Sequence, residues 1–327
     1  MDINVIRERL GPDWNKVSDS IRTVLGSDIE LLNTTNMSIL SHSGKQMRPM
    51  LALLIARACS GGIVTEASIR YAASSELLHN ATLLHDDVAD ESEQRRGVPT
   101  IMSLMGPSVS VLLGDYWLVK AMELILGDAD SDTRVIKIFS KTLSDLAEGE
   151  MLQLQKAQKG DTDQEDYLRI IYNKTASLFE AACVSAAVSV GASEQYEKAA
   201  KDYAVALGLA FQIKDDILDY DGGEAVGKPL GVDILEQKIT MPLLGAMSNV
   251  SDQEAGRIRG LVSDIVGHPE YRDEIVEFVK SNGGLEYAVR ELDRYVEDAV
   301  KALEVLPDSY EKECLVALAY FTGKRNR

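Results

Sequence analysis

Two runs of aspartate, far apart in the chain, share the spacing Asp-Asp-x-x-Asp. Their members are Asp86, Asp87, Asp90, Asp215, Asp216 and Asp219. Each run closes an apolar, helix-like segment, so its first and last aspartates, four residues apart, point the same way. Crowded carboxylates cost free energy unless a cation or a proton relieves their repulsion. Oxygen ligands without cysteine or paired histidine favour a hard ion, Mg²⁺ or Mn²⁺. Because Mg²⁺ commonly shares its shell with phosphate, we expect a clamp for a metal–diphosphate cluster.

A solvated acidic helix end is the alternative for either run. For a single run this alternative has about even odds, since short motifs often match by chance. It weakens for two matching runs that both follow long apolar segments and both have cations nearby.

A cationic segment, Gly44-Lys45-Gln46-Met47-Arg48-Pro49, opens an apolar helix that Gly61-Gly62 ends. Pro49 suits the first turn of that helix. Lys45 and Arg48 lie at the end where the helix dipole favours anions, so cations and free N–H groups together predict a phosphate pocket. Two exposed surface charges are an equally simple interpretation.

A second cationic pair, Arg95-Arg96, follows the first aspartate run in a segment, 91–100, that we expect to be a loop. Two arginines beside a metal site suit bidentate contacts to diphosphate. Simple pairing with Glu91 and Glu93 is the alternative.

Long helices must position these groups. Thr65 can cap a helix of roughly 25 residues and about 40 Å that ends at the first run and so must cross the core of its domain. His79 lies seven residues before Asp86, on nearly the same face. A lone histidine on an apolar face is more often a core residue, but its alignment with the carboxylates raises the odds of function. Ser193 caps the helix that delivers the second run.

Further helices are expected from about 108 to 126 and from about 131 to 159. Thr162-Asp163-Gln164-Glu165 has the form of a capping box and starts the next helix. That helix carries Lys174 and Thr175 in an Ala-rich, apolar stretch, where a buried cation or hydroxyl needs a partner. From Ser251 onward we expect capped helices, with breaks at 267–269, 282–284 and Pro307.

The segment 221–231 is rich in glycine and contains Gly227-Lys228. It fits most of a phosphate-binding P-loop, but Pro229 stands where Ser or Thr should bind Mg²⁺, and a helix precedes it where a strand is required. We therefore reject nucleotide binding and expect a lid that carries Lys228, with Lys238 just beyond.

The composition sets the protein class. The 327 residues are 45% hydrophobic and carry a net charge of −18, which predicts a folded chain and argues against nucleic acid or an anionic membrane as partner. Cys59, Cys183 and Cys314 lack metal-site spacing and are expected to be reduced core residues of a cytoplasmic protein. We find no signal peptide or membrane span, and we expect a single all-helical domain over residues 1–327.

These motifs, in this order, closely resemble the trans-prenyl diphosphate synthases of the polyprenyl synthetase family, and most of all its long-chain bacterial members. The resemblance runs from about Leu31 to the end of the chain. It rests on the following segments: Gly44–Pro49, Leu77–Asp90 with Arg95-Arg96-Gly97, Gly114-Asp115-Tyr116, Lys174-Thr175, Phe211–Asp219 and Gly227–Asp233.

The resemblance implies an all-α isoprenoid synthase bundle around a deep central apolar cavity, usually in a homodimer. It implies head-to-tail 1'-4 condensation of isopentenyl diphosphate with an allylic diphosphate, for quinone side chains. No side chain is needed to remove the final proton, because the departed diphosphate can itself accept it.

The resemblance also implies the site residues. Mg²⁺ would be contacted by Asp86, Asp90 and Asp215, and through water by Asp87, Asp216 and Asp219. The allylic diphosphate would be held by Arg95, Lys174, Gln212, Lys228 and Lys238. Isopentenyl diphosphate would be held by Lys45, Arg48, His79 and Arg96. Thr175 would contact the reacting region. The residues expected to matter most for catalysis are Asp86, Asp90, Arg95, Lys174, Asp215 and Lys228.

Product length is expected to depend on Ala81 and Thr82, one turn before the first run. Short-chain relatives carry a bulky aromatic there, so Ala-Thr implies an open floor and a product of about heptaprenyl to decaprenyl length. Three other functions stay open: a short-chain farnesyl or geranylgeranyl diphosphate synthase, a class I terpene cyclase, and a non-catalytic subunit of a heteromeric synthase.

Overall fold

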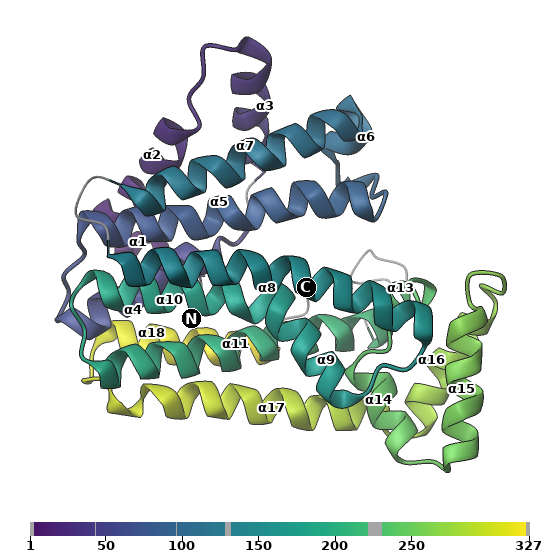
Figure 1. Ribbon diagram of the computed structural model, residues 1–327. Helices are drawn as coiled ribbons and strands as arrows, with labels where there is room; N and C mark the ends of the chain where they lie inside the picture. Colours follow the sequence, from purple (N-terminus) through teal and green to yellow (C-terminus); the bar gives the residue numbers. More distant parts are fainter. Residues whose placement is uncertain (1–2, 43, 96, 128–131, 222–230, 325–327) are drawn as a thin grey trace. The chain divides into compact units, whose positions relative to one another are not determined.

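Helices make up most of the protein, which we describe from a computed structural model (Figure 1). The structure describes residues 3–42, 44–95, 97–127, 132–221 and 231–324. Within these ranges the only strands are β1 (Gln94–Arg95) and β2 (Val98–Pro99), an antiparallel pair inside the segment expected to be a loop. The predicted all-α class is confirmed.

The chain forms two compact units. The first comprises residues 1–139, 181–200 and 305–315, and the second comprises 140–180, 201–304 and 316–327. Helices wholly in the first unit are α1 (Ile3–Leu10), α2 (Pro12–Val24), α3 (Glu30–Ser41), α4 (Met47–Ser60), α5 (Glu66–Ala89), α6 (Ile101–Met105) and α7 (Pro107–Leu126). Helices wholly in the second are α9 (Gln164–Ile171), η1 (Tyr172–Ala176), α13 (Val232–Leu235), α14 (Met241–Ser248), α15 (Asp252–Asp264), α16 (Tyr271–Ser281) and α17 (Gly284–Ala302).

Among the described elements, five have residues in both units. They are α8 (Thr133–Lys159), α10 (Ser177–Ser189), α11 (Glu194–Asp221), η2 (Leu303–Val305) and α18 (Tyr310–Lys324). The break at Pro307 falls between η2 and α18, as predicted. The breaks at 267–269 and 282–284 separate α15 from α16 and α16 from α17.

Helix α5 is the central element of the first unit. Thr65 caps it as predicted, accepting a hydrogen bond from the Ser68 amide at 3.1 Å while the Ser68 hydroxyl accepts one from the Thr65 amide. Its side chains are buried around most of its circumference, since α2, α4 and α7 all pack on it. The Ser110 hydroxyl of α7 donates to the Leu84 carbonyl at 2.8 Å. The C-terminal turn, which carries the first aspartate run, is therefore held by buried contacts.

The second unit has its own apolar core under α14, α15 and α16, which includes Leu243, Ile258, Ile275 and Val279. Ser251 caps α15, and Ser193 accepts a hydrogen bond from the Tyr196 amide in the first turn of α11. The predicted capping box at Thr162 is shifted by one residue, because Asp163 is the cap of α9 and Asp166 completes the box. The side chain of aspartate serves this role as well as threonine.

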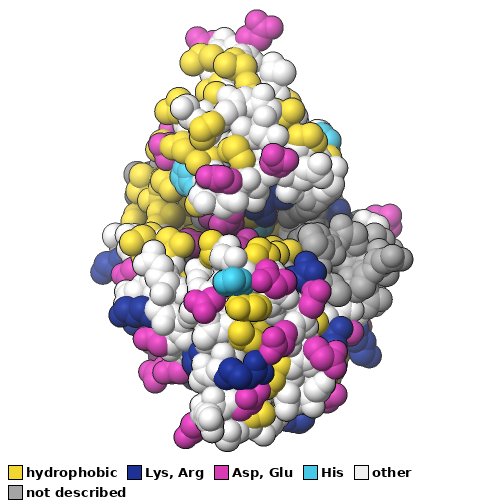
Figure 2. Space-filling model, turned by 90° about the vertical axis from the view of Figure 1, so that its right-hand side faces the viewer, with side chains coloured by type: hydrophobic (Ala, Val, Ile, Leu, Met, Phe, Trp, Pro, Cys, Tyr) yellow, Lys and Arg dark blue, Asp and Glu magenta, His cyan; other side chains and the backbone are white. Residues whose placement is uncertain are grey.

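Acidic side chains recur across the face drawn in Figure 2, as expected for a chain with a net charge of −18. No helix in the described part of the chain is long and apolar enough to cross a bilayer. Cys59, Cys183 and Cys314, all described, form no disulfide.

Candidate active site

The first aspartate run occupies the last turn of α5. Asp87 is buried, and the Arg95 Nε donates to its Oδ1 at 2.7 Å. Asp86 is half-buried, whereas Asp90 is exposed and is the C-terminal cap of the helix. Arg95 thus pairs with an aspartate of the run itself, although pairing with Glu91 or Glu93 was the alternative. Arg96 lies outside the described residues.

The segment with Lys45 and Arg48 opens α4. Gln46 precedes the helix in the left-handed conformation, with φ of 50°. Arg48 is buried in the first turn together with Pro49, whereas Lys45 is exposed. A buried arginine does not fit the interpretation of two exposed surface charges, so that alternative holds for Lys45 alone.

Three more predicted residues lie along α5. Ala81 is fully buried, and His79 and Thr82 are half-buried. The Thr82 hydroxyl donates to the His79 carbonyl at 2.8 Å, which satisfies this hydroxyl within the helix. The predicted roles of all three in substrate binding or product length remain predictions.

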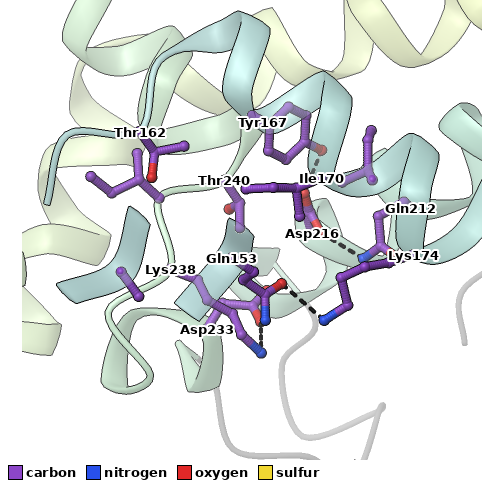
Figure 3. Close-up of a pocket in the computed structure, with 13 residues that line it drawn as sticks. Gln153, Thr162, Tyr167, Ile170, Lys174, Gln212, Asp216, Asp233, Lys238 and Thr240 are labelled. Carbon is purple, nitrogen blue, oxygen red and sulfur yellow. Dashed lines mark hydrogen bonds and ion pairs between the residues drawn. The ribbon is translucent and has the colours of Figure 1, made fainter. Parts of the chain in front are cut away.

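The second aspartate run lies near the end of α11, where a line of hydrogen bonds fixes its middle member (Figure 3). Asp216 is buried, and the Tyr167 hydroxyl of α9 donates to its Oδ2 at 2.5 Å. The Gln212 Nε2 donates to Asp216 Oδ1 at 3.0 Å. The Thr175 hydroxyl in turn donates to Gln212 Oε1 at 3.0 Å. Two predicted residues, Gln212 and Thr175, are therefore joined to the run in one polar network.

Lys174 and Thr175 lie in a single π-helical turn, η1, between α9 and α10. Such turns insert one extra residue into a helix and often occur at functional sites. Lys174 Nζ lies 2.5 Å from Glu150 Oε1 and 3.0 Å from Gln153 Oε1, both on α8. The turn therefore presents a cation and a hydroxyl side by side, each held by a neighbouring helix.

Two glycines allow other helices to approach this turn closely. A Cβ at Gly149 of α8 would lie 2.9 Å from Lys174 Cγ, and one at Gly208 of α11 would lie 2.5 Å from the Ala176 Cα. Both distances are shorter than real Cβ contacts. The geometry of the π turn therefore depends on these positions having no side chain.

The carboxylate of Asp219 contacts the backbone at the start of α13. It accepts hydrogen bonds from the amides of Val232 at 3.0 Å and Asp233 at 3.2 Å. Lys238 Nζ lies 3.8 Å from Asp233 Oδ1 and is closer still to Glu236. These contacts bring Asp233 and Lys238 beside the second run. Lys228 lies outside the described residues.

The electrostatics of this region fit a bound cation. Burial and the neighbouring Asp233 charge raise the pKa of Asp216 to about 8. Burial, opposed by Lys238, raises the pKa of Asp233 to about 6. Burial also raises the pKa of Asp219. A raised pKa means that the charged form of a carboxylate is disfavoured. A cation shared among several such carboxylates stabilises their charged forms.

Within the described ranges, no three side chains of His, Cys, Asp or Glu converge into a metal site by themselves. Mg²⁺ usually takes one or two carboxylates and completes its shell with water and phosphate. The donors of each run fit that chemistry, because the first and last aspartates stand four residues apart on one helix.

One pocket of the second unit collects many of these groups (Figure 3). Four predicted residues line it: Lys174, Gln212, Asp216 and Lys238. Five polar residues that the sequence did not assign to the site also line it: Gln153, Thr162, Tyr167, Asp233 and Thr240. Tyr167 precedes Lys174 by seven residues, so a shared helix face could have pointed to it, but its partner on α11 is not visible in sequence spacing.

Comparison with known proteins agrees with these motifs. The Polyprenyl synthetase family model matches residues 29–279. Octaprenyl diphosphate synthase of Haemophilus influenzae is 39% identical over all of this chain and 98% of its own length.

Two solved structures are similar over the whole chain. Decaprenyl diphosphate synthase from Rhodobacter capsulatus has a TM-score of 0.91 and 35% identity, with 100% of both chains covered. A polyprenyl synthase from Caulobacter crescentus CB15, complexed with calcium and isoprenyl diphosphate, has a TM-score of 0.89 and 32% identity, covering 100% of this chain and 98% of that one. On its motifs, its fold and these matches, the chain belongs to the polyprenyl synthetase family, whose members are trans-prenyltransferases.

Proposed function

We propose that this enzyme condenses isopentenyl diphosphate head-to-tail (1'-4) with an allylic diphosphate and makes a long-chain, all-trans polyprenyl diphosphate. The observation that carries the proposal is the pocket of the second unit, where Lys174 and Lys238 lie beside crowded carboxylates. Cations and metal-binding carboxylates together are what a departing diphosphate requires. Octaprenyl diphosphate synthase of Haemophilus influenzae and decaprenyl diphosphate synthase from Rhodobacter capsulatus, both named for long products, match over the whole chain.

Divalent metal, with Mg²⁺ first and Mn²⁺ second, is the proposed cofactor. Asp86, Asp90 and Asp215 would hold it directly, with Asp87, Asp216 and Asp219 in support. When bound, the metal would supply positive charge that stabilises the leaving diphosphate. The calcium and isoprenyl diphosphate in the Caulobacter crescentus structure support a divalent ion in this family.

The side chains of this protein would do the rest. Lys174, Arg95, Lys228 and Lys238 would orient the allylic diphosphate and take up charge as its C–O bond breaks. Gln212, aligned by its bonds to Asp216 and Thr175, would donate to the same diphosphate. Thr175, next to Lys174 in the π turn, would lie nearest the reacting carbons. Apolar helix walls would keep water from the allylic cation.

A second subsite would hold isopentenyl diphosphate through Lys45, Arg48, His79 and Arg96. The position of Arg48 in the first turn of α4 supports this role, because the helix dipole favours an anion at that end. We expect Arg48→Ala to raise the KM for isopentenyl diphosphate, and Lys228→Ala to act on the allylic substrate and on kcat. Equal effects of both changes on both substrates would contradict the division into two subsites.

The direct test supplies the purified protein with Mg²⁺, isopentenyl diphosphate and primers of several lengths, and measures product length by mass spectrometry. We expect about heptaprenyl to decaprenyl products. A farnesyl or geranylgeranyl product would instead establish a short-chain synthase. A cyclic hydrocarbon from an allylic diphosphate alone would establish a terpene cyclase. No turnover by the chain alone, with full turnover after adding a second protein, would establish a non-catalytic subunit.

Product length would be set along α5. The diphosphate end stays at Asp86 and Asp90, so the growing chain would pass Thr82 and the buried Ala81. Ala81→Tyr should shift products toward farnesyl or geranylgeranyl diphosphate while the first condensation stays fast. Overpacking could cost about 1–3 kcal/mol, so circular dichroism must first establish that the variant folds. A folded variant that keeps the wild-type product length would contradict this path.

A second copy of this chain is the proposed partner. Val111, Leu112, Val119 and Leu126 along α7 are 39–68% exposed, and contiguous apolar surface often marks a contact with another protein. Light scattering after size-exclusion chromatography should give the molecular mass of a dimer. Leu112→Glu should lower this mass toward that of a monomer. Cytoplasmic location and use of the product for quinone side chains remain predictions.

A further inference from the structure

The N-terminal helix α1 holds the segment that opens α4. The Arg7 guanidinium donates to the Lys45 carbonyl at 2.5 Å and to the Gly44 carbonyl at 3.3 Å. Both acceptors belong to the segment whose side chains, Lys45 and Arg48, we assign to isopentenyl diphosphate. Arg7 therefore contacts the backbone of that proposed subsite from a helix that lies outside the matched family region, 29–279.

The C-terminal end of α4 in turn contacts α1. Arg57, in the last turn of α4, donates to the carbonyls of Arg9 at 3.2 Å and Leu10 at 2.9 Å. It also pairs with Asp13 at 2.6 Å, at the start of α2. Arg7 of α1 thus binds the segment that opens α4, and Arg57 of α4 binds the end of α1. Ile6 and Leu10 of α1 are buried. Helix α1 cannot shift without moving Arg7 relative to the segment it holds.

The surroundings of Arg7 restrict its side chain. Its guanidinium lies over the Trp14 ring, 5.2 Å from the centroid. Burial lowers the pKa of Arg7, and the charge of Glu76 on α5 opposes that shift. An arginine keeps its proton throughout the accessible pH range. A charged, stacked and partly buried donor is suited to hold two carbonyls in one place.

The segment that Arg7 holds, residues 44–48, contains a residue with an uncommon backbone conformation. Gln46, directly after Lys45, adopts a left-handed φ of 50°, which residues with a Cβ adopt rarely and at a cost that their surroundings must offset. Bonds to the two preceding carbonyls are such a constraint. We propose that Arg7 is a positioning residue, which holds residues 44–48 in the conformation that binds the diphosphate of isopentenyl diphosphate. This proposal rests on the function proposed above.

Steady-state kinetics test the proposal. Arg7→Ala should raise the KM for isopentenyl diphosphate about tenfold, the effect of losing a charge-assisted hydrogen bond, which equals about 1.4 kcal/mol. Neither the KM for the allylic diphosphate nor kcat should change. Arg7→Lys, which keeps the charge but not the fork, should give an intermediate KM. Unchanged KM in a folded Arg7→Ala enzyme would overturn the proposal.

Arg9→Ala is the matched control. Arg9 lies on the same helix and carries the same charge, but its guanidinium lies over the Tyr310 ring, 5.1 Å from the centroid. If Arg9→Ala raised the KM for isopentenyl diphosphate as much as Arg7→Ala, long-range charge and not positioning would explain the effect, and the proposal would fail.

Hydrogen exchange gives a readout that needs no turnover. In Arg7→Ala, and to a lesser degree in Arg7→Lys, the amides of residues 44–48 should exchange faster, while those in the middle of α5 should not change. Unaltered exchange in this segment would show that Arg7 does not hold it. If the wild-type enzyme failed to join the two diphosphates, the proposed function would fall, and exchange would still decide whether Arg7 orders the segment.

Discussion

The two aspartate runs have the same sequence pattern but different surroundings. In each, the second aspartate is the buried one: Asp87 is 5% exposed and Asp216 is 2% exposed. Asp87 is paired with the guanidinium of Arg95. Asp216 receives hydrogen bonds from Tyr167 and Gln212, which are neutral. The repeated motif is therefore anchored by an ion pair in the first unit and by neutral donors in the second.

This difference decides which run most needs a cation. A guanidinium compensates the charge of a carboxylate, whereas a phenol and an amide only hydrogen-bond to it. Asp216 accordingly has a pKa raised by burial to about 8, and Asp233 and Asp219 nearby have raised pKa values as well. We infer that the second run is destabilised without metal, and that the first is already compensated in part.

The largest expected effect is on catalysis, where both runs should be equally necessary. Asp86→Ala or Asp215→Ala should lower kcat by about 100-fold or more, because each removes charge stabilisation made in the transition state. EDTA should abolish turnover, and Mg²⁺ should restore it. The exposed Asp19 of α2 provides the control, since Asp19→Ala should keep wild-type kcat. Near-normal turnover of either folded cluster variant would refute the mechanism with two runs.

The next effect concerns the π turn beside the second run. Gly208→Ala would place a Cβ 2.5 Å from the backbone Cα of Ala176, so α11 or the turn must move. We expect a loss of about 1–3 kcal/mol in the free energy of unfolding, as for overpacked cores, and a lower kcat. Gly256 of α15 is the matched helical glycine, because nothing lies within 4 Å of its Cβ position. Gly256→Ala should stabilise the protein by up to about 1 kcal/mol. Equal responses at both positions would mean that close packing does not maintain the turn.

The sequence predicted the position of both aspartate runs but only some of the contacts around them. The apolar, helix-like segments that each run closes placed both runs on helices, and the spacing of four residues placed their first and last aspartates on one face. The sequence also placed the caps Thr65 and Ser193. The contact of Arg95 with Asp87 was not predicted although only eight residues separate them, because diphosphate was the expected partner of Arg95 and pairing with Glu91 and Glu93 the alternative.

Contacts between distant helices were out of reach. The bond of Tyr167 to Asp216 joins residues 49 positions apart, and no periodicity encodes it. The π turn at Lys174 could not be predicted either, because its extra residue looks like ordinary helix in the sequence. It becomes intelligible only once Gly149 and Gly208 are seen to let α8 and α11 approach it.

A smaller effect tests the hydrogen bond that the neutral Tyr167 hydroxyl donates to Asp216 in the second run. Tyr167→Phe removes one donor from the buried Asp216 and should lower the free energy of unfolding by about 1–3 kcal/mol, measured with denaturant. Tyr172→Phe is the control, because its hydroxyl donates to Glu180 at 2.8 Å in a partly exposed place. The control should cost less, about 0.5–1.5 kcal/mol. A Tyr167→Phe protein as stable as wild type would show that Asp216 does not depend on this bond.

The smallest effect compares the two runs directly in the absence of metal. The charge of Asp215 contributes to the raised pKa of both Asp216 and Asp233, although burial dominates. Asp215→Asn removes this like charge and should raise the Tm in EDTA, whereas Asp86→Asn should change stability by no more than about 0.5 kcal/mol. Adding Mg²⁺ should reverse the order, because the wild-type protein gains binding free energy that Asp215→Asn partly loses. Differential scanning calorimetry with and without Mg²⁺ measures both steps. If Asp215→Asn lowered the Tm in EDTA while Asp86→Asn raised it, the first run and not the second would be the one under electrostatic strain.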